Sequence, residues 1–175
     1  TLGSVMPLIS LGEELRRRHK TDFSLLWVGT YRGVERAVVR AHKMEFTAIP
    51  AAKFRRYFSI KTLFEPIVFF AGLLKSLIII VTFKPDVLVA AGGFVSVPLH
   101  LIAFLLGVPT VVHQQDIEIG LANRIMKLFA RRITVTFEKS LGFFPKKKVV
   151  WTGNPVRREL LQGNKDRGMV RFHLD

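Results

Sequence analysis

Short apolar runs alternate along the chain with longer segments of helical length and composition. The apolar runs predict strands, and the longer segments predict helices between them. Strands are expected at residues 23–28, 45–49, 86–90, 110–113, 133–137 and 148–151. Helices are expected at residues 7–20, 63–83, 97–106 and 121–130, with shorter ones after Gly33 and at residues 157–161. Strands that alternate with helices in this way predict a Rossmann-like α/β fold, with a parallel sheet and helices on both faces.

The composition supports one folded domain with a full core. The chain has 175 residues, and 49% of them are hydrophobic, which argues against disorder. It contains no cysteine, so a disulfide framework and a cysteine-based metal site are both excluded. Its first residues do not resemble a signal peptide, because a basic start is missing and Glu13 and Glu14 interrupt the apolar run.

The net charge of +14 suits three kinds of partner: nucleic acid, anionic lipid and an anionic substrate. No RNA-binding, zinc-finger or recognition-helix signature accompanies the charge, which disfavours nucleic acid. The basic residues are interspersed with Phe, Leu and Ile, a mixture typical of proteins that bind a membrane surface. We therefore expect an anionic membrane surface as a partner and no nucleic acid.

The segment from residue 54 to 83 is the main candidate for membrane contact. Its apolar part, residues 67–81, contains Lys75 as its only charge and is shorter than the ~20 residues that a helix needs to cross hydrocarbon. The pattern leaves three arrangements open: a helix buried in the core, a helix lying in the membrane interface, and a membrane span. In the interfacial arrangement, aromatic side chains dip among the headgroups while basic side chains meet lipid phosphates. The residues expected to do so are Arg55, Arg56, Phe58, Lys61, Phe64, Phe69 and Phe70.

Two consecutive predicted strands end in residues suited to ligand binding. Gly92 and Gly93 follow the strand at 86–90, and the next strand ends in the polar run His113-Gln114-Gln115-Asp116. In an open α/β sheet, the carboxyl ends of neighbouring strands form the ligand crevice. The glycines let backbone N–H groups at a helix start approach an anion, although a tight turn without a ligand explains the same pair. His113 fits a structural, hydrogen-bonded histidine, and no second His lies at metal-ligand spacing, so we expect no metal site.

Several motifs in this part of the chain resemble the N-terminal domain of the MurG family of glycosyltransferases. They are GGFVSVP from Gly92, HQQD from His113, IGLANR from Ile119 and GNPVR from Gly153, and the similarity runs from Thr1 to about Leu161. The resemblance implies the acceptor-binding, N-terminal half of a GT-B fold. It also implies an enzyme that moves N-acetylglucosamine (GlcNAc) from UDP-GlcNAc to undecaprenyl-linked lipid I in peptidoglycan synthesis, with no cofactor and no metal required for the transfer.

Family members are peripheral proteins of the cytoplasmic face of the bacterial membrane. They carry an apolar patch rimmed by basic residues on this domain. The resemblance therefore favours the interfacial arrangement for residues 54–83.

The resemblance also implies roles for individual residues. Contacts to the acceptor and its diphosphate are expected from Thr1, Gly3, Ser4, Gly92, Gly93, Phe94, Gln114 and Asn123, and contacts to the nucleotide sugar from Asp116 and Arg157. From spacing alone, Asn123 also fits a helix-surface asparagine, and Arg157 a solvated arginine at a helix start.

The chain departs from the family pattern where ionisable or polar groups matter. Ser4 replaces a His, Gln114 replaces a Glu, and Asp116 replaces an Asn. Phe94 replaces a Tyr and so lacks its hydroxyl. Because an amide cannot act as a base, Asp116 is the candidate catalytic residue.

The predicted organisation is that of one half of a two-domain enzyme. Residues 1–162 form the acceptor-binding domain, and residues 163–175 begin a linker to a donor-binding domain outside the chain. A helix is predicted almost at the start, so the first strand of the domain is also expected outside the chain, which leaves one position of the sheet unfilled. Since Ser4 and Gln114 lack ionisable groups, a second hypothesis is a non-catalytic, membrane-docking acceptor subunit of a split glycosyltransferase. A polyanion-binding Rossmann domain is a third hypothesis, supported by charge alone.

Overall fold

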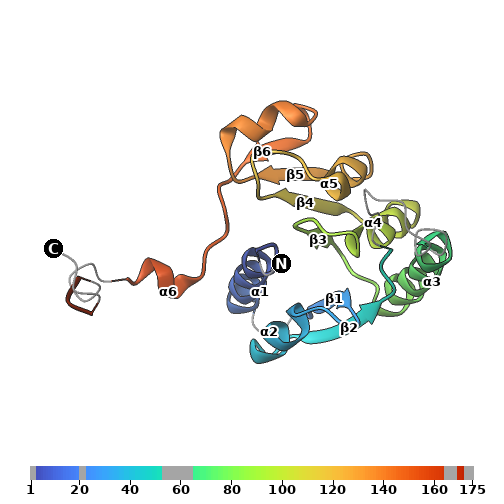
Figure 1. Ribbon diagram of the computed structural model, residues 1–175, viewed down its shortest axis with the longest axis horizontal. Helices are drawn as coiled ribbons and strands as arrows, with labels where there is room; N and C mark the ends of the chain where they lie inside the picture. Colours follow the sequence, from blue (N-terminus) through green and yellow to red (C-terminus); the bar gives the residue numbers. More distant parts are fainter. Residues whose placement is uncertain (1–2, 20–22, 53–64, 164–168, 172–175) are drawn as a thin grey trace.

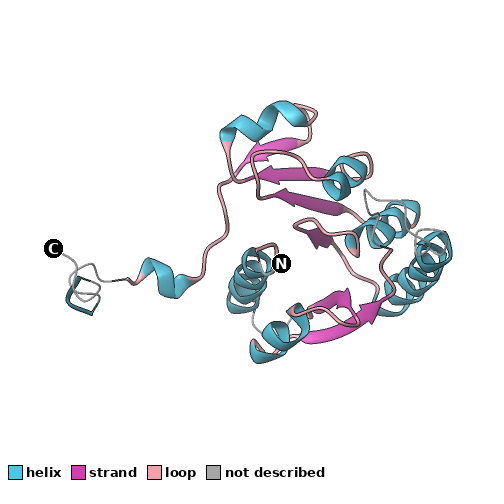
Figure 2. Ribbon diagram, in the orientation of Figure 1, coloured by secondary structure: helices cyan, strands magenta, loops and turns pink. Residues whose placement is uncertain are grey.

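The computed structural model describes residues 3–19, 23–52, 65–163 and 169–171. Helices and strands alternate along these residues, as the sequence predicts (Figures 1 and 2). Their order is α1 (Val5–His19), β1 (Leu26–Thr30), α2 (Glu35–Ala41), β2 (Glu45–Ile49), α3 (Glu65–Phe83), β3 (Leu88–Ala90), α4 (Ser96–Leu105), β4 (Thr110–Gln114), α5 (Leu121–Met126), β5 (Arg132–Val135), the 3-10 helix η2 (Glu138–Phe143), β6 (Val149–Trp151) and α6 (Arg158–Leu161).

All strand pairs among the described residues are parallel. Strands β1 and β2 pair with each other, and the remaining strands form a sheet in the order β3-β4-β5-β6. In the second sheet, Val112 of β4 lies between Ala90 of β3 and Ile133 of β5. The break between β1 and β3, visible in Figure 2, agrees with the expected unfilled position.

Helices cover both faces of the β1–β2 pair, because successive side chains of a strand point to opposite faces. Leu26 and Val28 pack with residues of α3 and α4, whereas Leu25 and Trp27 pack with residues of α1 and α2. A larger core joins β4 and β5 to α5, with Met126 and Ile133 fully buried. The Rossmann-like α/β fold is confirmed.

Most element boundaries differ from the prediction by a residue or two, with larger differences at β1 and α5. Strand β1 begins at Leu26 and continues to Thr30, and α5 ends at Met126 rather than at Ala130. Residues 138–143 form η2, for which no apolar pattern was recognised. Its position has a packing reason, since Leu141 contacts the core and the Ser140 hydroxyl donates to the carbonyls of Asp116 and Ile117.

Helix α3 is long and apolar enough to cross a membrane by length and composition, yet only 22% of its apolar window is buried. Its buried side consists of Gly72, Ser76, Ile79 and Ile80, and its most exposed apolar side chains are Ile67, Phe70, Leu74, Ile78 and Val81. Phe69 is partly buried and packs against the core, whereas its neighbour Phe70 is exposed, and their predicted contact with the membrane stays a prediction. Arg55, Arg56, Phe58, Lys61 and Phe64 lie outside the described residues.

Candidate functional site

The carboxyl ends of β3 and β4 border a pocket of about 330 Å³, which we call the strand-end pocket. Most of the predicted acceptor residues line it. Its lining consists of Gly3, Ser4, Ala91, Gly92, Gly93, Gln114, Gln115, Asp116, Gly120, Ala122 and Asn123. Phe94 is not among the lining residues, and Thr1 lies outside the described residues.

Gly92 and Gly93 give the pocket its backbone wall. Their φ angles are +98° and +87°, which side chains with a Cβ rarely adopt. The chain then enters α4, where the Ser96 hydroxyl donates to the Gly92 carbonyl at 3.0 Å. Glycine is therefore required at these two positions because the backbone before α4 adopts positive φ angles.

Gln114 is fully buried, and the polar atoms of its side chain are engaged inside the protein. Its Nε2 donates to the carbonyls of Asp116 and Glu118, each at 2.8 Å. Its Oε1 accepts from Asn123 Nδ2 at 2.6 Å. Gln114 therefore holds the loop after β4 in place, a role for which a carboxylate lacks the donors.

Asn123 presents an unsatisfied acceptor at the pocket. Its Nδ2 donates to Gln114 Oε1 and more weakly to the His113 carbonyl at 3.4 Å, so the amide orientation is set by two acceptors. Its Oδ1 is buried and has no hydrogen-bond partner among the described residues. A Cβ added to Gly92 would lie 3.6 Å from this oxygen, which places the oxygen beside the glycine turn. Leaving such a group unpaired costs about 1–3 kcal/mol.

Asp116 and Ser4 line the same pocket, and both side chains are at least partly accessible. The Asp116 carboxylate forms no ion pair within the described part of the chain. Gln115, which the sequence did not single out, donates from Nε2 to the Gly3 carbonyl at 3.0 Å and joins this loop to the start of α1. The sequence feature that could have identified Gln115 is its position between the candidate residues Gln114 and Asp116.

His113 is buried at the end of β4, as expected for a structural histidine. Its Nδ1 lies 2.8 Å from Thr134 Oγ1, and its Nε2 lies 3.2 Å from Thr136 Oγ1 and 3.3 Å from Asn154 Oδ1. Burial lowers the pKa of His113, and the hydrogen bond to Asn154 opposes that shift. Among the described residues, no cluster of His, Asp or Glu side chains is suited to a metal ion.

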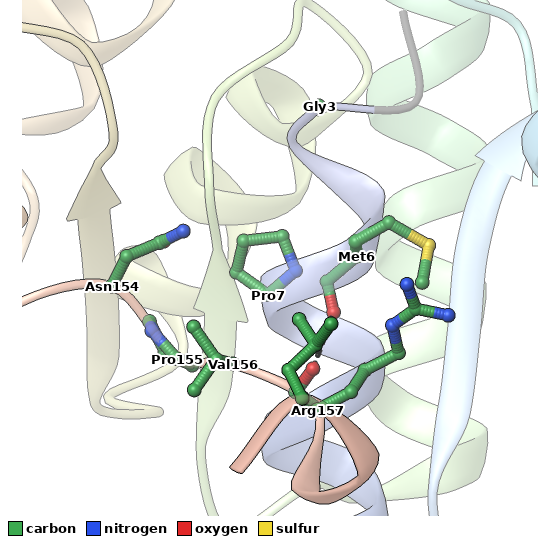
Figure 3. A pocket seen from close by; sticks show the side chains of 9 residues that line it. Gly3, Met6, Pro7, Asn154, Pro155, Val156 and Arg157 are labelled. Atoms are coloured by element: carbon green, nitrogen blue, oxygen red, sulfur yellow. Dashed lines mark hydrogen bonds between the residues drawn. The ribbon is translucent and has the colours of Figure 1, made fainter. Parts of the chain in front are cut away.

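A second pocket, which we call the α1 pocket, lies between α1 and the segment that follows β6. It has a volume of about 360 Å³ and is lined by Gly3, Met6, Pro7, Ser10, Asn154, Pro155, Val156, Arg157 and Leu160 (Figure 3). Arg157 lines this pocket and Asp116 lines the other, so the two predicted nucleotide-sugar contacts do not share one cavity. Gly3 borders both pockets.

Comparison with protein families gives this geometry a context. The sequence model of the glycosyltransferase family 28 N-terminal domain matches residues 1–135. The chain belongs to this family. A relative from Bacillus cereus, named UDP-N-acetylglucosamine--N-acetylmuramyl-(pentapeptide) pyrophosphoryl-undecaprenol N-acetylglucosamine transferase 2, is 35% identical over 96% of the chain. A Clostridium botulinum transferase of the same name, without the final numeral, is 37% identical over 97% of the chain.

This family 28 chain spans 47% of the length of each of these two relatives. Its fold matches the crystal structure of Acinetobacter baumannii MurG with a TM-score of 0.71 and 21% identity, covering 89% of the chain and 42% of MurG. It also matches the UDP-GlcNAc 2-epimerase of Neisseria meningitidis, solved bound to UDP-GlcNAc, with a TM-score of 0.66 and 14% identity. That match covers 99% of the chain and 50% of the epimerase.

Proposed function

We propose that this chain is the acceptor-binding half of a MurG-like hexosyltransferase, which moves GlcNAc from UDP-GlcNAc to lipid I. The observation that carries the proposal is the strand-end pocket, where the positive-φ glycine pair and the unpaired Oδ1 of Asn123 meet. The names of the relatives support the substrates. Such an enzyme acts in peptidoglycan synthesis and thereby contributes to cell shape and division.

Each side of the strand-end pocket suits one part of the acceptor. The backbone at Gly92 and Gly93, at the start of α4, suits the diphosphate, because a helix N-terminus attracts anionic oxygens. The Oδ1 of Asn123 suits a hydroxyl or amide N–H of the sugar, which would satisfy a buried acceptor. In the full enzyme, Arg157 would meet the diphosphate of the donor, since its guanidinium binds phosphate through two hydrogen bonds.

The transfer needs a base for the acceptor hydroxyl, and Asp116 is the carboxylate lining the strand-end pocket. In the proposed step, the hydroxyl gives its proton to Asp116 and its oxygen attacks the anomeric carbon of GlcNAc. The bond between that carbon and the UDP oxygen breaks, and UDP leaves. The result is inverted configuration at the anomeric carbon.

A binding experiment with the chain alone tests the acceptor assignment. We expect a water-soluble lipid I analogue to bind without any nucleotide sugar, and Asn123→Leu to weaken the binding at least tenfold. Gln162→Leu, at an exposed site directly after α6, is the matched control. Binding of UDP-GlcNAc but not of the analogue would contradict the assignment.

One observation favours a second candidate function, that of a non-catalytic acceptor subunit of a split glycosyltransferase. Gln114 is locked into the loop after β4, and Ser4 replaces the family His, so neither position offers a base. Supplying a donor-binding half, fused or as a separate chain, separates the candidates. Transfer that depends on Asp116 identifies the catalytic half, and transfer that ignores Asp116 identifies the docking subunit.

We also infer that the chain attaches peripherally to the cytoplasmic face of the membrane through α3. Two observations support this inference. Helix α3 has exposed apolar side chains, and the net charge of +14 attracts anionic lipid. Helix α4 packs beside α3 and ends in the exposed residues Phe104, Leu105 and Leu106, which extend the apolar surface. The domain division at residue 162 stays a prediction.

A further inference from the structure

The chain from β6 to α6 is held to the rest of the protein by very few hydrogen bonds. The last backbone bond to the sheet is from Thr152 N to the Val135 carbonyl. Within the described part of the chain, the amides of residues 153–157 donate to no backbone carbonyl, and Pro155 has no N–H to donate. Gly153, with φ of +74°, turns the chain away from the sheet at this point. Figure 1 shows the segment leaving β6 and running past α1 towards α6, and its residues border the α1 pocket.

One side chain of this segment reaches back to the sheet. Asn154 Oδ1 lies 3.3 Å from Nε2 of the buried His113. If Nε2 carries the proton, its N–H is shared between Asn154 Oδ1 at 3.3 Å and Thr136 Oγ1 at 3.2 Å, and Nδ1 is free to accept from the Thr134 hydroxyl at 2.8 Å. One neutral tautomer therefore satisfies the contacts of both ring nitrogens, and the buried imidazole stays neutral near pH 7 because burial lowers its pKa.

His113 also sits between the two pockets. Its neighbour Gln114 lines the strand-end pocket, and its partner Asn154 lines the α1 pocket. Figure 3 shows Asn154 and Arg157 on opposite sides of the α1 pocket, with Arg157 reaching along the side of Met6. Asn154 lies three residues before Arg157 in the same short segment.

We propose that His113 is a positioning residue, which through Asn154 fixes the segment carrying Arg157 relative to the polar end of β4. The hydrogen bond couples the acceptor pocket to the side chain that faces an anionic donor. The proposal rests on the proposed function, because it explains how the contacts to the two substrates are held at a fixed position relative to each other. The rigidity of residues 153–157 that it predicts can be measured without any substrate.

Backbone NMR of the 175-residue chain tests the proposal. In the wild type, we expect the heteronuclear NOE of Gly153, Asn154, Val156 and Arg157 to match that of β5. Asn154→Leu removes the acceptor at an exposed position and should lower the NOE of the whole segment, whereas Asn154→Asp keeps an oxygen acceptor and should restore it. Long-range ¹H–¹⁵N spectra should show His113 as the Nε2–H tautomer.

Two further variants make the experiment specific. His113→Phe keeps a planar ring without nitrogens, and combined with Asn154→Leu it should loosen the segment no more than either change alone. Thr152→Val removes the neighbouring bond from Thr152 Oγ1 to the Gly153 carbonyl and should leave the segment ordered. If His113→Phe fails to fold, the two Asn154 variants decide.

Three results would overturn the proposal. They are a mobile segment in the wild type, an Nδ1–H tautomer, and an Asn154→Leu segment as ordered as the wild type. The last result would mean that packing of Val156 and Leu160 in the α1 pocket holds the segment instead. None of these results depends on sugar transfer, so a failure here is distinct from a failure of the proposed function.

Discussion

Asp116 is the residue on which the proposed chemistry depends. It lines the strand-end pocket and is exposed, whereas Gln114 is buried and cannot ionise. In an enzyme that contains this chain and a donor-binding half, Asp116→Asn should lower kcat by ~10²–10⁴, the usual cost of losing a general base. Ser4→Ala should have a much smaller effect, and Glu118→Gln, an exposed carboxylate two residues away, serves as the control. Turnover of Asp116→Asn near that of the wild type would contradict this role and favour the docking subunit, with the base supplied by another residue.

Individual contacts were predictable only where backbone geometry or a family motif specified them. The convergence of Gly92, Gly93, Asn123 and Asp116 follows from the rule that strand ends meet at one edge of a sheet. The engagement of Gln114 did not follow, because its partners are carbonyls of an irregular loop, and no pattern in the sequence encodes them. Arg157 was placed with Asp116, although the turn at Gly153 carries it to the α1 pocket.

At the scale of the elements, the packing of α4 on β4 makes stability depend on pH through His100. This side chain is fully buried, donates from Nδ1 to the Ser96 carbonyl at 3.0 Å, and leaves Nε2 unpaired among the described residues. Burial lowers its pKa from 6.5 to about 4. Between these two values the unfolded chain binds the additional proton, so the free energy of unfolding falls as pH falls from 6.5 to 4. The loss is roughly 3 kcal/mol at about 1.4 kcal/mol per pKa unit.

Urea unfolding between pH 4 and 7 measures this dependence, and His100→Phe should remove much of it. The buried His113, whose pKa is also lowered, accounts for part of what remains. An equally steep loss of stability in His100→Phe would contradict the assignment.

Helix α3 shows why the sequence could not tell its two sides apart. Residues 67–81 are apolar almost all round, so no amphipathic pattern distinguishes Phe69 from Phe70. In the structure, Phe69 packs against the core and Phe70 is 66% exposed. Phe70→Ser should weaken binding to anionic vesicles and leave the urea midpoint unchanged. Phe69→Ser should lower the urea midpoint, because deleting buried aromatic surface costs on the order of 1 kcal/mol or more. The reverse result in co-sedimentation and urea unfolding would exclude α3 as the membrane-facing helix.

For the molecule as a whole, alternation of apolar and helical segments was enough to predict the architecture. Every predicted strand exists, and β2 has the predicted boundaries, Glu45–Ile49. The η2 helix escaped prediction because it is held by Leu141 in the core and by Ser140 hydrogen bonds to a distant loop, neither of which has a local signal. The relation to the glycosyltransferase family came from motifs, and the match to the family 28 N-terminal domain confirms it.

The net charge of +14 raises the question of whether membrane attraction comes from one surface or from the whole protein. Variants of two groups of three basic residues can be compared to decide this. One group is Arg55, Arg56 and Lys61, which precede α3, and the other is Arg16, Arg17 and Arg18 at the end of α1. Each basic side chain near an anionic leaflet contributes about 1 kcal/mol, and the attraction is screened beyond ~10 Å at 0.1 M salt. Changing Arg55, Arg56 and Lys61 to Gln should therefore weaken partitioning by about a hundredfold, if the contributions add.

The Arg16, Arg17 and Arg18 variant loses the same charge, but Arg17 and Arg18 pair with Glu14 and lie on a different helix from α3. It should partition nearly as well as the wild type. The measurement is co-sedimentation with vesicles of varied anionic-lipid content and ionic strength. Equal losses in both variants would show that total charge, rather than the surface at α3, drives attachment. A chain that ignores anionic lipid, or that stays bound in high salt and carbonate, would disprove peripheral attachment altogether, because screening must release a protein held by surface charge.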